Sequence, residues 1–164
     1  FMRQLKEVLD ENRYLHSLGV MKTAALLAKR YEQDVIRIMT AGLLHDCAKC
    51  IPGREKIWLC EKVNIPMTAI EKRNPGLLHA KLGAYLAKTK YGINDEEILN
   101  AIWYHCTGRP QMSLFEKIIY VADVIVSYAT IINLGQKLQT FDLDVTKQVS
   151  EYVFGKIKLI FNIN

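Results

Sequence analysis

The stretch AGLLHDCAKCIP, residues 41–52, places three polar side chains inside an otherwise apolar run. These are His45, Asp46 and Lys49. A carboxylate buried without a partner is costly, so Asp46 must be paired, protonated or bound to a metal. Folding alone requires none of these three groups at this position, and the stretch therefore predicts a functional site on a helical segment.

Outward from this stretch, apolar residues recur at helical spacing along the chain, and no alternating pattern typical of a strand is found. The spacing predicts an all-α fold, a single compact helical bundle that spans residues 2–164. Pro52 and Gly53 end the segment that carries His45. The helices expected are a short one at 5–9 and longer ones at about 13–31, 34–49, 54–63, 76–92, 94–106, 113–129 and 142–161.

The composition is that of an ordinary globular protein: 164 residues, half of them hydrophobic. Lys and Arg number 22 against 17 Asp and Glu, an excess that favours an anionic partner or simply a basic solvated surface. No run reaches the ~18 apolar residues of a membrane span, and no signal-peptide pattern is present, so a cytoplasmic location is expected. Cys47 and Cys50 form a C-x-x-C motif, but without the strand or second motif that a redox or zinc site needs, ordinary thiols are favoured.

Histidines and buried aspartates occur on several different predicted helices. A single histidine in a helix is more often a satisfied core residue than a ligand, but helices packed in a bundle can bring several such groups to one centre. A mixed set of imidazoles and carboxylates suits Fe, Mn, Co, Ni or Zn. The residues concerned are His16, His45, His79, His105, Asp46 and Asp123.

Three glycines lie one turn from three of these histidines: Gly19, Gly42 and Gly83. Glycine inside a helix costs about 1 kcal/mol relative to alanine, so its presence indicates a close approach by another helix or by a ligand.

Cations flank the same motifs. Lys49 follows His45 by about one turn, and Arg109 follows His105 in the loop TGRPQ. A metal-activated water among cations suits attack on phosphorus, where negative charge must be neutralised during transfer.

The order of His16, the pair His45-Asp46, and a distant Asp123 resembles the HD-domain metal-dependent phosphohydrolases. The blocks RYLHSLGVMKTAALLAKRY, AGLLHDCAK, LLHAKLGA and TGRPQMSLFEKIIYVAD are similar to the YqeK family, the bacterial symmetrical diadenosine tetraphosphate hydrolases. The resemblance covers roughly residues 13–125 and implies a metal-dependent phosphohydrolase core at about 12–130.

The resemblance implies a set of roles. Attack of a metal-bound water on phosphorus would cleave diadenosine tetraphosphate into two ADP, with Asp46 and Lys49 as catalytic groups. An iron-type metal would be held by His16, His45, Asp46 and Asp123. The substrate would be contacted by His16, Lys49, His79, His105, Cys106 and Arg109. In many HD enzymes the two central histidines, here His79 and His105, bind a second metal.

The chain departs from the family pattern after Asp123, where Val126 and Ala129 replace a glutamate and an arginine. These changes concern the choice of nucleotide rather than the metal ligands. Alternatives are another HD-type nucleotide phosphohydrolase acting on a nucleoside mono- or diphosphate, or a nucleotide-binding module without turnover. The expected partner is a small-molecule nucleotide; a homodimer is possible in principle, and neither membrane nor nucleic acid is expected.

Overall fold

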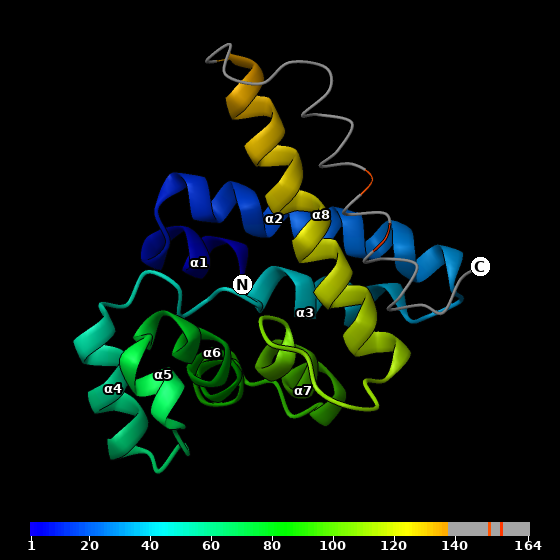
Figure 1. Ribbon diagram of the computed structural model, residues 1–164. Coiled ribbons are helices and arrows are strands. Elements are labelled where there is room, and N and C mark those ends of the chain that lie inside the picture. Colours follow the sequence, from blue (N-terminus) through cyan, green and yellow to red (C-terminus); the bar gives the residue numbers. More distant parts are fainter. Residues whose placement is uncertain (138–150, 152–154, 156–164) are drawn as a thin grey trace.

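A computed structural model describes residues 1–137, 151 and 155 of the chain (Figure 1). Within those residues it contains helices and no strand, which confirms the predicted all-α fold. The elements are α1 (Met2–Val8), α2 (Glu11–Arg30), α3 (Val35–Leu44), α4 (Gly53–Lys62), α5 (Ala69–Arg73), a short 3₁₀ helix (Pro75–Leu77), α6 (Leu78–Thr89), α7 (Glu96–Tyr104) and α8 (Leu114–Lys137).

Several of these helices begin at a side chain that satisfies their free backbone N–H groups. Asp10 accepts a hydrogen bond from the backbone of Arg13 at the start of α2, and Asp34 and Asp95 cap α3 and α7 in the same way. At α8, Ser113 and Glu116 bond each other's backbone N–H groups, the reciprocal capping box that the sequence predicts there. Local chemistry thus determines where α2, α3, α7 and α8 begin.

The helices pack as two groups. α2, α3 and α8 pack against one another, and α7 joins this group to α6, which in turn packs against α4 (Figure 1). The main core is shared by α2, α3, α7 and α8, and a smaller apolar cluster lies under α4 and α6. The candidate site lies where the two groups meet.

Close contact between α2 and α3 depends on Gly42. A Cβ added there would lie 3.1 Å from the Cα of Met21, and one added at Gly19 would lie 3.0 Å from Cγ1 of Val126 on α8. The glycines near the histidines therefore serve helix–helix packing, and this packing brings the helices that carry His16, His45 and Asp123 together.

Two details differ from the sequence prediction. α3 ends at Leu44, and residues 45–50 form successive turns with hydrogen bonds from Cys47 N to Leu44 O and from Lys49 N to Asp46 O. The one-turn helix α5 was not predicted, because five residues are too few to show a helical period.

The helix predicted at 142–161 lies outside the described residues, and the assignment of all of 2–164 to one domain stays a prediction. In the described part of the chain, no helix has the length and apolar character that a membrane span requires.

Candidate metal centre

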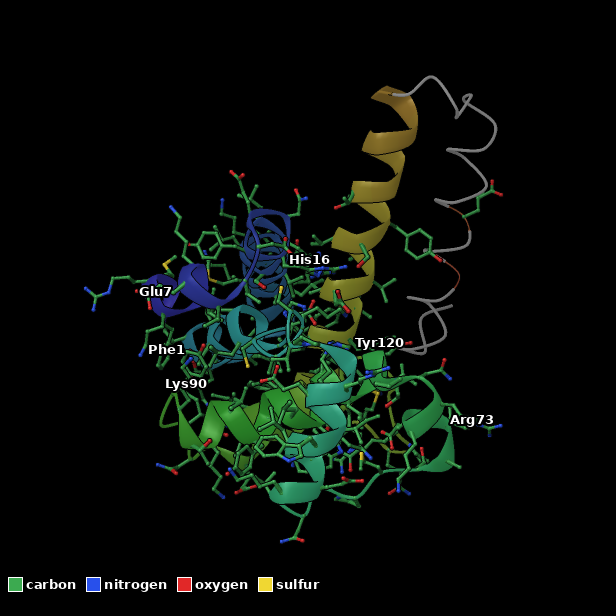
Figure 2. The ribbon with its side chains drawn as sticks, turned by 90° about the vertical axis from the view of Figure 1, so that its left-hand side faces the viewer. Phe1, Glu7, His16, Arg73, Lys90 and Tyr120 are labelled. Atoms are coloured by element: carbon green, nitrogen blue, oxygen red, sulfur yellow. The ribbon has the colours of Figure 1, made fainter. Side chains whose placement is uncertain are left out.

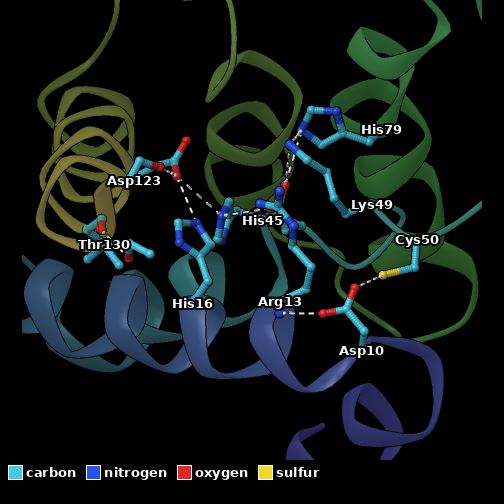
Figure 3. A network of polar contacts seen from close by, with 12 residues as sticks. Asp10, Arg13, His16, His45, Lys49, Cys50, His79, Asp123 and Thr130 are labelled. Atoms are coloured by element: carbon cyan, nitrogen blue, oxygen red, sulfur yellow. Dashed lines mark hydrogen bonds and ion pairs between the residues drawn. The ribbon is translucent and has the colours of Figure 1, made fainter. Parts of the chain in front are cut away.

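Three separate elements bring the predicted metal ligands together. His16 comes from the middle of α2, Asp123 from α8, and the pair His45-Asp46 from the turn after α3. Figure 2 shows His16 where α2 meets α8. Nε2 of His16 lies 3.0 Å from Oδ1 of Asp123, and Nε2 of His45 lies 3.8 Å from the same oxygen and 3.7 Å from Oδ2 of Asp46. Their ligand atoms form one cluster, with His45 in the middle (Figure 3).

The two other histidines meet Asp46 from the opposite side. Oδ1 of Asp46 lies 3.1 Å from Nε2 of His79 and 3.5 Å from Nε2 of His105, and these two nitrogens are 3.1 Å apart. His45, Asp46 and His105 form a second group with metal-ligating distances that overlaps the first. All four histidines of the chain therefore converge on one centre, as the sequence predicts.

Three of the imidazole rings are oriented by backbone carbonyls three residues earlier in the chain. Nδ1 of His45 bonds the carbonyl of Gly42 at 2.7 Å, Nδ1 of His105 bonds that of Ile102 at 2.7 Å, and Nδ1 of His79 bonds that of Gly76. A carbonyl can only accept, so each Nδ1 carries the hydrogen, and in the neutral ring Nε2 is left as an acceptor. The Nε2 lone pairs of three rings therefore face one another and a carboxylate, which is the arrangement that a cation requires.

Burial and the surrounding groups keep the imidazoles of His45 and His79 neutral and the two carboxylates charged. Burial lowers the pKa of His45 to about 4 and also lowers the pKa of His79. For Asp46, burial alone would raise the pKa, but the nearby imidazoles of His45 and His105 hold it well below the usual range. Burial likewise opposes ionisation of Asp123, while the hydrogen bond with His16 lowers its pKa to about 2. Near neutral pH the centre thus holds two carboxylates and no cationic imidazole at His45 or His79.

Two buried atoms of the cluster accept no hydrogen bond from any residue that the structure describes. They are Nε2 of His45, in a side chain without exposed surface, and Oδ1 of Asp46, in a side chain 2% exposed. Buried polar atoms in proteins are nearly always satisfied, so two orphaned acceptors on adjacent residues indicate a missing partner. A divalent metal ion between them fits both atoms, and the residues present therefore suit the metal that the sequence predicts.

Two cations border the cluster. Nζ of Lys49 lies 3.1 Å from Nε2 of His79 and 3.5 Å from Oδ1 of Asp46, so the predicted proximity of Lys49 holds, although Lys49 lies on a turn rather than on a helix. Arg13 places Nη1 3.8 Å from Oδ2 of Asp46. The sequence pattern gave no role to Arg13, although its place three residues before His16 on α2 puts both side chains on one helix face.

Arg109 is paired away from the metal cluster. Nη2 of Arg109 lies 2.8 Å from the buried Oε1 of Glu116, and its guanidinium lies over the ring of Tyr104. Its partners among the described residues are thus outside the metal cluster. Cys106 is partly buried, and burial raises the pKa of its thiol.

The C-x-x-C motif does not act as a pair. The buried thiol of Cys47 donates to the carbonyl of Gly83, whereas the exposed thiol of Cys50 points to the carboxylate of Asp10. Both are free, which agrees with ordinary thiols.

A cleft of about 680 Å³ adjoins the centre between α2 and α8, and we call it the α2–α8 cleft. His16 and Arg13 line its inner side, and Val126 lines it where the YqeK pattern has a glutamate. The full lining is Asn12, Arg13, Leu15, His16, Val126, Ser127 and Thr130.

An all-helical bundle with a His, a His-Asp pair and a distant Asp at one centre defines the class of HD-domain proteins. The family model described as "HD domain" matches residues 13–127, and the chain belongs to this family.

Among proteins of known name, the symmetrical bis(5'-nucleosyl)-tetraphosphatase of Bacillus subtilis is 45% identical over 121 residues, which cover 74% of this chain and 64% of that one. The protein of the same name from Halalkalibacterium halodurans is 43% identical over 124 residues, 76% of this chain and 66% of that one. The matched part thus spans slightly less than two-thirds of these relatives. A crystal structure of an HD superfamily hydrolase from Clostridium acetobutylicum, described as involved in NAD metabolism, superposes with a TM-score of 0.72 at 37% identity. That match covers 94% of this chain and 95% of the other.

Proposed function

We propose that the protein is a metal-dependent hydrolase that cleaves diadenosine tetraphosphate symmetrically into two ADP. The observation that best supports a hydrolytic metal centre is that two buried acceptors, His45 Nε2 and Asp46 Oδ1, have no hydrogen-bond partner among the described residues. The substrate is inferred from the two relatives named symmetrical bis(5'-nucleosyl)-tetraphosphatase.

The metal would be held by His16, His45, Asp46 and Asp123, a nitrogen and oxygen set that suits iron and also Mn, Co, Ni or Zn. A divalent ion bound there would acidify water toward neutral pH and offset negative charge on a phosphoryl group. The facing Nε2 atoms of His79 and His105 would take either a second ion or a phosphate oxygen.

Residues around the metal would orient the attacking water and neutralise charge on the substrate. A carboxylate with a strongly lowered pKa is a poor proton acceptor, so Asp46 would orient the attacking water by accepting a hydrogen bond. Lys49 and Arg13 would neutralise charge on the polyphosphate from opposite sides of Asp46. Cys106 would lie beside the nucleotide, and Arg109 would approach the phosphates only by leaving Glu116.

One nucleoside would occupy the α2–α8 cleft, next to His16 and Arg13. Val126 makes the wall of this cleft apolar, and Ala129 supplies no guanidinium. Contacts to the base would therefore rest on shape and apolar surface more than on charge.

Product analysis tests the proposal. Metal-loaded protein is incubated with diadenosine tetraphosphate, and the nucleotides are separated by anion exchange. ADP as the sole product supports symmetrical cleavage, whereas ATP with AMP contradicts it. Release of inorganic phosphate from a nucleoside mono- or diphosphate, with diadenosine tetraphosphate left intact, would instead identify a nucleotide phosphatase.

Two aspartate variants show whether the products come from this centre. Asp46→Ala should lose both bound metal and hydrolysis while keeping its helical content. Asp95→Ala removes the cap of α7 and the Arg37 ion pair, at the end of α7 opposite to His105, and should keep activity. Tight nucleotide binding without turnover, with any divalent metal, would point to a binding module.

A further inference from the structure

A second cleft, of about 480 Å³, lies between α5, the start of α6 and the end of α7, and we call it the α5–α7 cleft. Its volume is within the range of sites that bind small organic ligands. The side chains that matter here are Ile70, Leu77, Lys81, Trp103, Tyr104 and Thr107.

The walls of this cleft are aromatic and aliphatic, and its charged groups are already paired. Nζ of Lys81 donates to the carbonyl of Pro66 at 2.8 Å and to Glu71 at 2.9 Å, and it also lies over the ring of Trp103. Glu71 in turn accepts from Thr68. The cleft therefore suits a neutral planar ring rather than a phosphate, because stacking on Trp and Tyr needs no counter-charge.

The α5–α7 cleft is lined in part by α6, which carries His79, and by the end of α7, which leads to His105. Tyr104 immediately precedes His105, and Ala80, also in the lining, immediately follows His79. His16, by contrast, lines the α2–α8 cleft itself. Figure 3 shows the His16–Asp123 pair on one side of His45 and His79 with Lys49 on the other.

Cations accompany the row of ligands between the two clefts. Arg13 lines the first cleft and Lys49 contacts His79. Arg109 lies over Tyr104 at the second cleft and would meet a phosphate by leaving Glu116. This order matches a polyphosphate with an uncharged ring system at each end.

We propose that the α5–α7 cleft binds the second nucleoside of a dinucleoside polyphosphate, while the first occupies the α2–α8 cleft. The inference rests on the proposed function and adds to it: two nucleoside sites on either side of the metal centre would hold the middle of the bridge at the reacting position. Cleavage into equal halves would then follow from binding at both ends.

Trp103 can report on the cleft directly, because the chain has only two tryptophans. In Trp58→Phe protein, adenosine should quench the fluorescence of Trp103 to saturation. Ile70→Ala in this background trims the exposed wall and should weaken adenosine binding about threefold. Ile36→Ala, which trims another exposed isoleucine, on α3, should leave it unchanged.

Trp103→Phe protein keeps Trp58, which lies on α4 under Lys62, and serves as the optical control. Its fluorescence should not respond to adenosine. Absence of quenching in Trp58→Phe protein, or equal quenching in both proteins, overturns the proposal.

Kinetics supply the second readout. Wild-type enzyme should show a KM for diadenosine tetraphosphate about tenfold below that for adenosine 5'-tetraphosphate, which lacks one nucleoside. Ile70→Ala should raise the first KM and leave the second unchanged. Equal changes in both KM values contradict a site for the second nucleoside.

The two hypotheses fail separately. If wild-type protein forms no ADP from diadenosine tetraphosphate, the proposed function is wrong, and the titration of Trp103 with adenosine still decides whether the cleft binds a nucleoside.

Discussion

His45 has a fully buried side chain whose Nε2 has no hydrogen-bond partner among the described residues, and its ring is neutral near pH 7. A proton and a metal ion would compete for this atom, so acid should act on the centre twice. Protonation of Nε2 blocks the lone pair that would bind the metal. It also places a positive charge on a side chain that has no surface exposed to solvent, which destabilises the fold.

The metal-free protein should lose stability as the pH falls from about 6.5 to about 4. In the unfolded chain a histidine takes up its proton near pH 6.5, whereas in the folded protein the pKa of His45 is about 4. Between these values the unfolded state binds more protons than the folded state. The free energy of unfolding therefore decreases as the pH is lowered, by about 3 kcal/mol for this one group. The lowered pKa of His79 acts in the same direction, and the aspartates add to the loss only at lower pH.

Urea unfolding of chelator-treated protein at a series of pH values measures this slope. His45→Gln should have a shallower slope over the same range. An identical slope in the variant would show that His45 is not buried in its neutral form.

Lys56 is a buried lysine that supports the turn carrying Lys49. It is 4% exposed, and its Nζ donates at 2.9 Å to the backbone carbonyl of Lys49. Lys56→Met keeps the aliphatic stem but leaves this carbonyl unpaired, at a cost of about 1–3 kcal/mol in stability. Because Lys49 then loses its anchor, KM for the polyphosphate should rise together with the loss of stability, and both are measured on the same preparation.

Lys56→Arg restores a donor and should recover part of both effects. Lys88→Met removes an exposed lysine whose ion pair with Glu96 is 3.5 Å long, and should match the wild type. A normal KM in Lys56→Met would show that the Lys49 turn holds its shape without this hydrogen bond.

At the scale of elements, the distance between α2 and α3 decides whether the ligands meet. Gly42→Ala would place a Cβ 3.1 Å from the Cα of Met21, which is backbone and cannot rotate away. The two helices must separate, so we expect a loss of about 1–3 kcal/mol in stability and weaker metal binding, since His16 and His45 lie on the two sides of this contact. Thermal unfolding and metal titration measure the two effects.

Gly76→Ala is the matched control, because nothing lies within 4 Å of a Cβ added there. It should leave metal affinity unchanged. If Gly42→Ala bound metal like the wild type, the close approach of α2 and α3 would not be what assembles the centre.

Elements also show what could be predicted from the sequence. The convergence of His16, His45 and Asp123 was predictable, because polar groups inside apolar helical faces are costly unless the fold brings them to partners. The end of α3 at Leu44 was not, since no glycine or proline follows until Pro52 and the change from helix to turn lies in hydrogen bonds over three residues. The pairing of Arg109 with Glu116 depends on the path of the loop between them, which periodicity cannot describe.

At the scale of the molecule, the centre joins residues from α2, α6, α8 and the segments that follow α3 and α7. A divalent ion bound only by the folded state should therefore stabilise the whole fold. At a hundredfold excess over Kd the gain is about 2.7 kcal/mol, which corresponds to a rise in Tm of about 5–10 °C for a chain of this size.

Scanning calorimetry with and without chelator measures this rise for iron, manganese and zinc in turn. The Tm of Asp46→Ala should not respond to any of them, whereas that of Asp95→Ala should rise by the same amount as in the wild type. An equal rise in Asp46→Ala would place the stabilising ion elsewhere in the molecule.

The bonds from Nδ1 of His45, His79 and His105 to carbonyls three residues earlier have one more consequence. Each ring is aimed by the backbone just before it, and for His105 the segment that follows is the loop that leads to α8. Insertions or exchanges in that loop can thus accumulate over generations while the hydrogen bond that directs the ring of His105 is kept. Related proteins with this fold can therefore change their substrate through this loop while they keep the same metal-binding residues.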